Sequence, residues 1–165
     1  MNIQQFVEFG LKRQIPDLLI NRGMQLEIGP GENPCIEATD FLDLPGWNAD
    51  LDEIPFQDDF FDVVHAYHIL EHVYYPIDLL REIERVLKPG GHANIVVPYA
   101  LADLAHGDLD HKHTFTEETW KNTFTNKGYT KHRTRPWQFK VHANFLCGVT
   151  FRNLCVFTQL QKVDQ

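Results

Sequence analysis

Apolar residues occur along this chain in short runs separated by glycine, proline and acidic residues, which is the pattern of strands alternating with helices. The runs predicted to be strands are residues 24–28, 36–41, 47–51, 60–67 and 93–98. Between the last two, Pro76 can occupy a first helical position, and apolar residues follow it at helical spacing up to Leu87. Buried strands that alternate with helices indicate a parallel α/β sheet, so we expect this fold class.

The two ends of the chain have different patterns. Residues 3–22 have apolar positions at near-helical spacing, which predicts one or two short helices. The polar, histidine-rich stretch 99–115 is predicted to be a loop, and Thr116 is predicted to cap a helix that follows it. Two β-like stretches, 129–140 and 148–161, close the chain without a helix between them. They are expected to form an antiparallel hairpin on the edge of the sheet.

The composition is that of one globular domain. With 165 residues, the chain has the length of a single domain with a core of its own. Its formal net charge of −8 disfavours a nucleic-acid partner, because such partners need clustered lysine and arginine. An apolar run of membrane-spanning length and a signal-peptide layout are both missing, so no membrane partner is expected. Three cysteines without a CxxC pair favour a reducing cytoplasm, and the oligomeric state is not predicted.

The first predicted strand ends in a glycine turn, Gly29-Pro30-Gly31. Such a turn brings backbone N–H groups close to a ligand at the carboxyl end of a parallel sheet, although it also serves as a plain tight turn that needs positive φ. Glu27, at the end of the strand, would repel the pyrophosphate of a dinucleotide and attract a cation such as an amino-acid ammonium. Pro34 also replaces the third glycine of GxGxxG. The pattern therefore disfavours NAD and favours a ligand with a positive group.

Four segments, in order and at the expected spacing, resemble the motifs of the class I S-adenosylmethionine (SAM) dependent methyltransferases. They are residues 26–31, 50–64, 68–73 and 80–91. Residues 111–119 also resemble a His-x-x-x-Phe-Thr-x-x-Thr stretch of a small, type-11-like subgroup from bacteria and phages.

The resemblance implies a Rossmann-like α/β sandwich whose mostly parallel sheet has an antiparallel last strand. Within a single domain, 1–165, it implies a cofactor-binding core at 24–98. A helical lid at 1–23 would precede this core, and a substrate-side loop and the hairpin would follow it at 99–165.

By the same resemblance, ten residues would bind SAM. They are Glu27, Ile28, Gly29, Pro30 and Gly31 of the turn region, Asp40 and Phe41, Asp50 and Leu51, and His68. The turn and His68 would lie against the methionine part of SAM. Asp40 would end the second strand and accept the ribose hydroxyls, and Asp50 would accept the amine of adenine. Only eleven positions separate Gly29 from Asp40, against about 20 in the usual motif, so a full first helix cannot fit and Asp43 is the alternative at the ribose.

Two groups of histidines allow a second interpretation. His68-Ile69-Leu70-Glu71-His72 spells HxxEH, in which two histidines on one helical face would bind zinc and Glu71 would act as a base. The stretch 106–113 alternates His and Asp and could form a metal loop, but a flexible polar loop at the mouth of the site is favoured, and no metal is predicted. The candidate catalytic residues are Asp110, His111 and His113, with His111 as a general base.

The predicted function is transfer of a methyl group from SAM to a small-molecule acceptor in the cytoplasm, by in-line displacement at the sulfonium methyl. Positioning supplies most of the catalysis in such a reaction, and a base is needed only where the acceptor must lose a proton. A SAM-binding protein without catalysis is the first alternative, and a zinc-dependent hydrolase that uses HxxEH is the second. The sequence does not specify the acceptor or its reacting atom.

Overall fold

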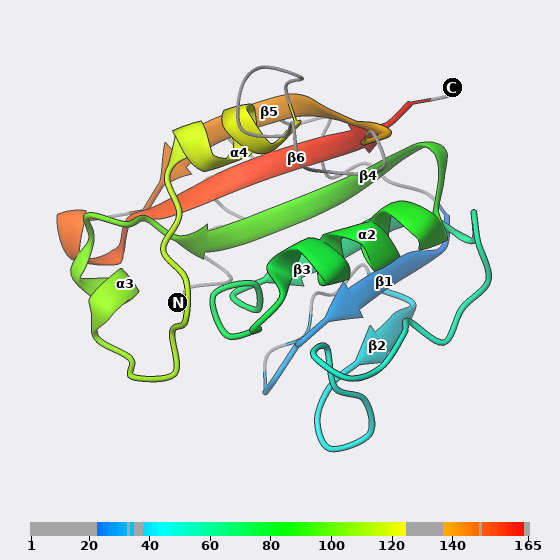
Figure 1. The fold of residues 1–165 in the computed structure, drawn as a ribbon, viewed down its shortest axis with the longest axis horizontal. Helices are drawn as coiled ribbons and strands as arrows, with labels where there is room; N and C mark the ends of the chain where they lie inside the picture. Colours follow the sequence, from blue (N-terminus) through cyan, green and yellow to red (C-terminus); the bar gives the residue numbers. More distant parts are fainter. Residues whose placement is uncertain (1–22, 33, 35–37, 125–136, 149, 164–165) are drawn as a thin grey trace.

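The structure is a computed structural model that describes residues 23–32, 34, 38–124, 137–148 and 150–163 (Figure 1). The helices predicted at 3–22, and with them nearly all of the predicted lid, lie outside these residues. In the described part of the chain, no helix is long and apolar enough to cross a membrane.

The described residues build a six-stranded sheet in the order β2-β1-β3-β4-β6-β5 (Figure 1). The strands are β1 (Gln25–Ile28), β2 (Asp40–Leu42), β3 (Phe61–Tyr67), β4 (Leu87–Pro98), β5 (Phe139–Cys147) and β6 (Cys155–Lys162). The first four pair in parallel, whereas β6 is antiparallel to both of its neighbours, β4 and β5. This arrangement confirms the predicted α/β fold with a mostly parallel sheet, and it places the predicted hairpin at the edge.

Two helices cover one face of the sheet. α2 (Pro76–Val86) begins at the predicted proline, and α4 (Glu117–Phe124) begins directly after Thr116. Ile83 of α2 and Trp120 of α4 are almost fully buried in one apolar cluster, which also contains Val64 of β3 and Ile95 of β4. The two helices therefore pack on the residues of the central strands that belong to this cluster.

The cap of α4 is reciprocal. The N–H of Thr119 donates to Oγ1 of Thr116 at 3.3 Å, and the N–H of Thr116 donates to Oγ1 of Thr119 at 3.0 Å. Thr119 thus does what a glutamate does in a capping box, and the predicted cap at Thr116 is confirmed. The loop predicted before it contains one short helix, α3 (Asp103–His106), and its two ends meet in a bridge between Tyr99 and Phe115.

Residues 47–51, predicted to be a strand, form turns instead. The C=O of Asn48 accepts the N–H groups of Leu51 and Asp52, at 3.1 and 2.9 Å. The apolar signal comes mainly from Trp47, which is 7% exposed and donates its indole N–H to the C=O of Glu53, while Leu51 is 81% exposed. Burial of Trp47 and hydrogen bonds within the segment are enough to hold these turns, and no pairing with another strand is needed. The prediction of a strand at 47–51 was therefore wrong.

The limits of three other strands also differ from prediction. β4 begins at Leu87, directly after α2, and includes the Pro89-Gly90 pair that was predicted to be a break. Its pairing with β3 is irregular there and becomes regular from His92 onward. The final hairpin lies further along the chain than predicted, with β5 at Phe139–Cys147, a 3-10 turn at Phe151–Asn153 and β6 ending at Lys162. Residues 125–136 lie outside the described residues.

The carboxyl ends of the four parallel strands meet at one edge of the sheet. β2 lies on one side of β1, and β3 lies on the other side (Figure 1). The order of the strands therefore reverses between β1 and β3, and ligands of open α/β sheets bind at such a switch point.

Candidate functional site

Gly29 follows β1 at the switch point and touches the loop after β3. Its φ is +68°, in the left-handed region, and its N–H donates to the C=O of Leu42 at 2.8 Å. A Cβ at this position would lie 3.0 Å from Cδ1 of Ile69. Glycine is therefore required both for the backbone conformation and for the close approach of Ile69.

Asp43 is the carboxylate that stands at the carboxyl end of β2. Its Oδ2 accepts the N–H of Gly31 at 2.9 Å, and its Oδ1 accepts the N–H of Leu44 at 2.8 Å. Gly31 has a φ of +53°, and a Cβ there would meet no atom of the described chain within 4 Å. The hydrogen bond between these residues joins the turn after β1 to the turn after β2.

Asp40 does not end the second strand as predicted. It is the first residue of β2 and pairs with Leu26, so two further residues separate it from the strand's carboxyl end. Its Oδ2 accepts the hydroxyl of Thr39 at 2.9 Å. The second strand was predicted at 36–41, but β2 begins only at Asp40. The position directly after the strand, which was expected to hold Asp40, is therefore occupied by Asp43.

A cavity of about 120 Å³ opens beside these turns. It is lined by Gly29, Leu42, Asp43, Leu44, Trp47, Asn48, Ala49, Asp50, Ile69, His72 and Val73. Of the ten predicted cofactor residues, Gly29 and Asp50 line it. Asn48, Ile69 and His72 also line it but were not predicted, because each reaches the cavity only through the packing of turns that follow different strands.

Asp50 is held in place by the loop after β3. Its Oδ1 accepts the N–H of Tyr74 at 2.6 Å, and its own N–H donates to Oδ1 of Asn48 at 2.9 Å. Leu51, which was predicted to bind the cofactor together with Asp50, is 81% exposed and lines a second cavity, beside α2, together with Asp50. Asp50 thus lies between the two cavities.

Glu27, Ile28 and Pro30, which were also predicted to bind the cofactor, are less accessible to a ligand. Glu27 is 1% exposed, and Ile28 is fully buried in the apolar core. Pro30 is partly buried in the turn, whereas the Phe41 ring on β2 is 47% exposed. A buried carboxylate needs hydrogen-bond or ionic partners, so Glu27 is part of the internal structure of the sheet.

His68 leaves β3 in a strained conformation. Its φ is +55°, which is unusual for a residue with a side chain, and its N–H donates to the C=O of Val96 at 2.8 Å. Nδ1 lies 3.2 Å from Oε1 of Glu71, and Nε2 lies 3.9 Å from Sγ of Cys155. Burial raises the pKa of the Cys155 thiol to about 12, so this sulfur is protonated at neutral pH.

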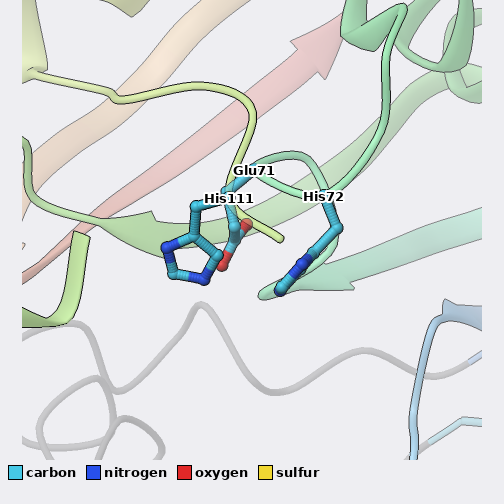
Figure 2. Close-up of side chains that lie close together, drawn as sticks. All are labelled: Glu71, His72 and His111. Atoms are coloured by element: carbon cyan, nitrogen blue, oxygen red, sulfur yellow. The ribbon is translucent and has the colours of Figure 1, made fainter. Parts of the chain in front are cut away.

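The loop after β3 and the loop after β4 bring three side chains together. Glu71, His72 and His111 each direct one potential ligand atom into a region where these atoms lie within 4.8 Å of one another (Figure 2). The rings of His72 and His111 meet edge to face, with 4.7 Å between their centroids. The N–H of Lys112 donates to the C=O of Glu71 at 2.7 Å, which ties the two loops together.

The three predicted catalytic residues do not form one group. His111 lies in the cluster just described, whereas Nε2 of His113 is 3.3 Å from the C=O of Tyr74. Asp110 is exposed, and its N–H donates to Oδ1 of Asp108 at 2.9 Å. His111 is therefore the member of the predicted set that the fold places beside other ionisable side chains near the cavity.

The geometry required for HxxEH zinc binding is not present. His68 and His72 lie in a turn, where the N–H of His72 donates to the C=O of Ile69, and not on one face of a helix. Oε1 of Glu71 is engaged by His68, so these two residues interact with each other. The ring of His72 contacts that of His111, which lies nearly forty residues later in the chain. The HxxEH motif does not predict this contact.

Part of the chain is similar in sequence to known methyltransferases. Residues 33–95 match the family model described as a methyltransferase domain. The sterol 4-C-methyltransferase strm-1 of Caenorhabditis elegans is 38% identical over 64 residues, which are 39% of this chain. The matched segment spans only 18% of the length of that relative.

Solved structures match almost the whole chain at low sequence identity. The Haloferax volcanii protein solved in complex with the Trm112 methyltransferase activator has a TM-score of 0.68 at 13% identity, covering 97% of this chain and 89% of its own. The N-methyltransferase NodS of Bradyrhizobium japonicum, in complex with S-adenosyl-L-homocysteine, has a TM-score of 0.58 at 12% identity, covering 98% and 85%. The chain thus has the fold of these methyltransferase structures, and its residues 33–95 are similar to the methyltransferase-domain family.

Proposed function

We propose that this protein transfers a methyl group from SAM to a small-molecule acceptor at the carboxyl edge of β1 and β3. The observation that carries the proposal is Gly29 at the switch point, where a left-handed backbone and the contact with Ile69 shape one wall of the cavity. Two carboxylates, Asp43 and Asp50, line the same cavity. A cavity that is lined by apolar side chains and a few polar groups is typical of a small-molecule site.

The residues present fit the parts of SAM. Asp43 uses one lone pair on each oxygen for the N–H groups of Gly31 and Leu44, so each oxygen can accept a further hydrogen bond from a ribose hydroxyl. Asp50 can accept the adenine amine in the same way. The cavity of about 120 Å³ is smaller than the roughly 300 Å³ of a small ligand site, so it suits the nucleoside end of SAM. The methionine end would then extend over the open face of Gly31.

The chemistry that SAM supplies when bound is a methyl group whose bond to the sulfonium breaks as a bond to the acceptor forms, leaving a neutral thioether. The chain's own contribution is to hold the two reactants in line, which can lower the barrier by many kcal/mol. His111 is the residue placed to receive a proton from an acceptor hydroxyl or amine. Its Nδ1 donates to the C=O of Ala105 at 3.2 Å, because a carbonyl can only accept, and this leaves Nε2 free to take up a proton.

The acceptor class and the compartment are part of the same proposal. A net charge of −8 argues against a nucleic-acid acceptor, and the site is bordered by loops of this chain that leave room for a small molecule. The unpaired, buried thiols of Cys147 and Cys155 are consistent with the cytoplasm.

Calorimetric titration of the purified chain with SAM and with S-adenosyl-L-homocysteine tests the proposal. We expect saturable binding of both, and formation of S-adenosyl-L-homocysteine when a panel of small alcohols, amines and thiols is added. A folded protein that binds neither compound at millimolar concentration would overturn the assignment. Binding of SAM without turnover on a broad panel would instead indicate a SAM-binding protein that does not catalyse.

A further inference from the structure

We propose that Glu71, His72 and His111 form a binding site for a divalent transition-metal ion. The three potential ligand atoms lie within 4.8 Å of one another, at the junction of the loops after β3 and β4 (Figure 2). A bound zinc ion, with bonds of 2.0–2.2 Å, holds its ligand atoms roughly 3.3 Å apart. Small rotations of these side chains would therefore be enough to close the site around an ion.

The carboxylate of Glu71 has an unsatisfied oxygen that a cation would satisfy. The side chain is 1% exposed, and its Oε1 accepts from His68 Nδ1 at 3.2 Å. Its Oε2 is buried and makes no hydrogen bond within the described residues. A buried carboxylate oxygen without a partner costs free energy, and a metal ion is a partner that removes this cost.

His111 has the orientation of a metal ligand. Because its Nδ1–H donates to the C=O of Ala105, the ring is fixed in the tautomer whose Nε2 carries a free lone pair. Histidine ligands of metals usually donate their other ring N–H to a carbonyl or carboxylate in this way. The same loop is fastened beside Glu71 by the N–H groups of Lys112 and His113, which both donate to the C=O of Glu71.

A further carboxylate, that of Asp108, belongs to the same loop as His111, whose N–H donates to the C=O of Asp108 at 3.4 Å. The pKa of Asp108 is lowered, chiefly by the hydrogen bond from the N–H of Asp110 and to a smaller extent by attraction to His111 and His72. The opposing charge is the ammonium of Lys112, which donates to the C=O of His72 and lies 4.5 Å from the ring centroid of Tyr74. The charge around the three ligands is thus mixed, and the net contribution of Glu71 and Asp108 is negative.

The ligand set selects the kind of ion. Two imidazoles and one carboxylate suit zinc, iron(II), cobalt(II) or manganese(II), whereas magnesium and calcium prefer oxygen ligands. Three protein ligands leave a coordination position open. His72 also lines the cavity, so a molecule in the cavity could reach the open position. When an ion is bound, Nε2 of His111 is a ligand and cannot be the base described above. If the proposed methyl transfer holds, the ion takes over this role, because an acceptor oxygen or nitrogen bound to it loses its proton more readily.

Metal titration of the untagged 165-residue chain tests the proposal. The protein is stripped with a chelator and then titrated with cobalt(II), followed by visible absorption, and with zinc(II), followed by calorimetry. We expect one ion per chain. His72→Ala, His111→Ala and Glu71→Gln should each weaken zinc affinity by at least tenfold.

His106→Ala is the matched control, because His106 lies in the same histidine-rich stretch but is exposed and bonded to the C=O of Ala100. Its zinc affinity should be that of the wild type. The proposal is overturned if the wild-type chain shows no saturable binding at 100-fold molar excess of zinc, or if the control loses affinity as much as the three cluster variants. SAM titration of the stripped chain distinguishes failure of the metal proposal from failure of the proposed function. A chain that binds SAM but no metal would overturn the metal site and leave the proposed methyl transfer standing.

Circular dichroism and thermal melting of each variant accompany these titrations. If a variant does not fold, the proposal is judged on the wild-type chain alone, from its metal stoichiometry and from the coordination environment that the cobalt spectrum reports. Absorption typical of nitrogen and oxygen ligands in a low-symmetry site supports the cluster, and a spectrum of hexa-aqua cobalt overturns it.

Discussion

The carboxylate of Asp43 accepts the N–H of Gly31 at 2.9 Å and thereby joins two turns that follow neighbouring strands. Gly31 comes after β1, and Asp43 is the first residue after β2. A carboxylate at the end of the second strand is therefore present even though the crossing between the two strands is short. This relationship leads to the first of four predictions.

Replacing Asp43 should weaken SAM binding, whereas replacing Asp40 should not. In Asp43→Ala the ribose hydroxyls would lose their acceptor and Gly31 its tether, so we expect at least a roughly tenfold loss of affinity, equal to about 1.4 kcal/mol. Asp40→Ala, at the far end of β2, is the control. Calorimetry measures both. Equal losses in the two variants would show that neither carboxylate has a specific role.

A side chain at position 29 should destabilise the fold and impair the site. In Gly29→Ala the new Cβ must adopt a φ of +68° and would lie 3.0 Å from Ile69. The left-handed conformation alone costs about 1–2 kcal/mol. Gly46→Ala is the control, because its Cβ would meet the C=O of Asp43 at an ordinary 3.7 Å. Urea unfolding of both variants measures the difference, and an equally stable Gly29→Ala would contradict the argument.

Acid should remove part of the stability that depends on Glu82. The hydrogen bond from Arg85 is the main cause that lowers the pKa of Glu82 below the ordinary 4.5, and the N–H of Ile54 also donates to it. A lowered carboxyl pKa stabilises the folded state fully above the ordinary value, and this stabilisation is lost as pH falls through the lowered value.

We therefore expect Glu82→Gln to lower the melting temperature at pH 7, by an amount that shrinks toward pH 3. Glu118→Gln, an exposed residue paired with Lys121, should show a much smaller difference over the same range. Melting curves recorded between pH 3 and 7 provide the measurement. A pH-independent difference for Glu82→Gln would mean that ionisation of this residue is not involved.

The two described cysteines should be unreactive in the folded protein. Burial raises the pKa of Cys147 to about 11 and that of Cys155 to about 12, so neither supplies thiolate at neutral pH. In a Cys35→Ser background, a thiol reagent at pH 8 should label neither cysteine within minutes under native conditions and both in denaturant. Rapid native labelling would show that this end of β6 opens easily.

Much of the fold could be predicted because its signals are local. α2 begins at Pro76, where the residue's fixed φ and missing N–H suit a first helical position. β3 and β4 contain the continuous apolar runs of buried parallel strands, and Thr116 caps α4. Each of these features depends on residues within one or two turns of one another, so the sequence contains the information directly.

The candidate site was only partly predictable, because register and loop docking decide it. The glycine turn and Asp50 were identified, but Asp43 was only an alternative to Asp40. Which carboxylate ends β2 depends on the pairing of Leu26 with Asp40, an interaction between strands that a linear pattern does not specify.

By itself, the sequence determined the α/β class, the glycine turn at the end of β1 and the positions of the main helices, since these follow from short-range backbone preferences and apolar periodicity. Tertiary structure alone decided that His111 meets Glu71 and His72, and that turns at 47–51 close the cavity. The physical reason is that hydrogen bonds such as that from Lys112 N–H to the C=O of Glu71 join loops separated by about forty residues of strand and helix, and these loops meet only when the sheet has formed.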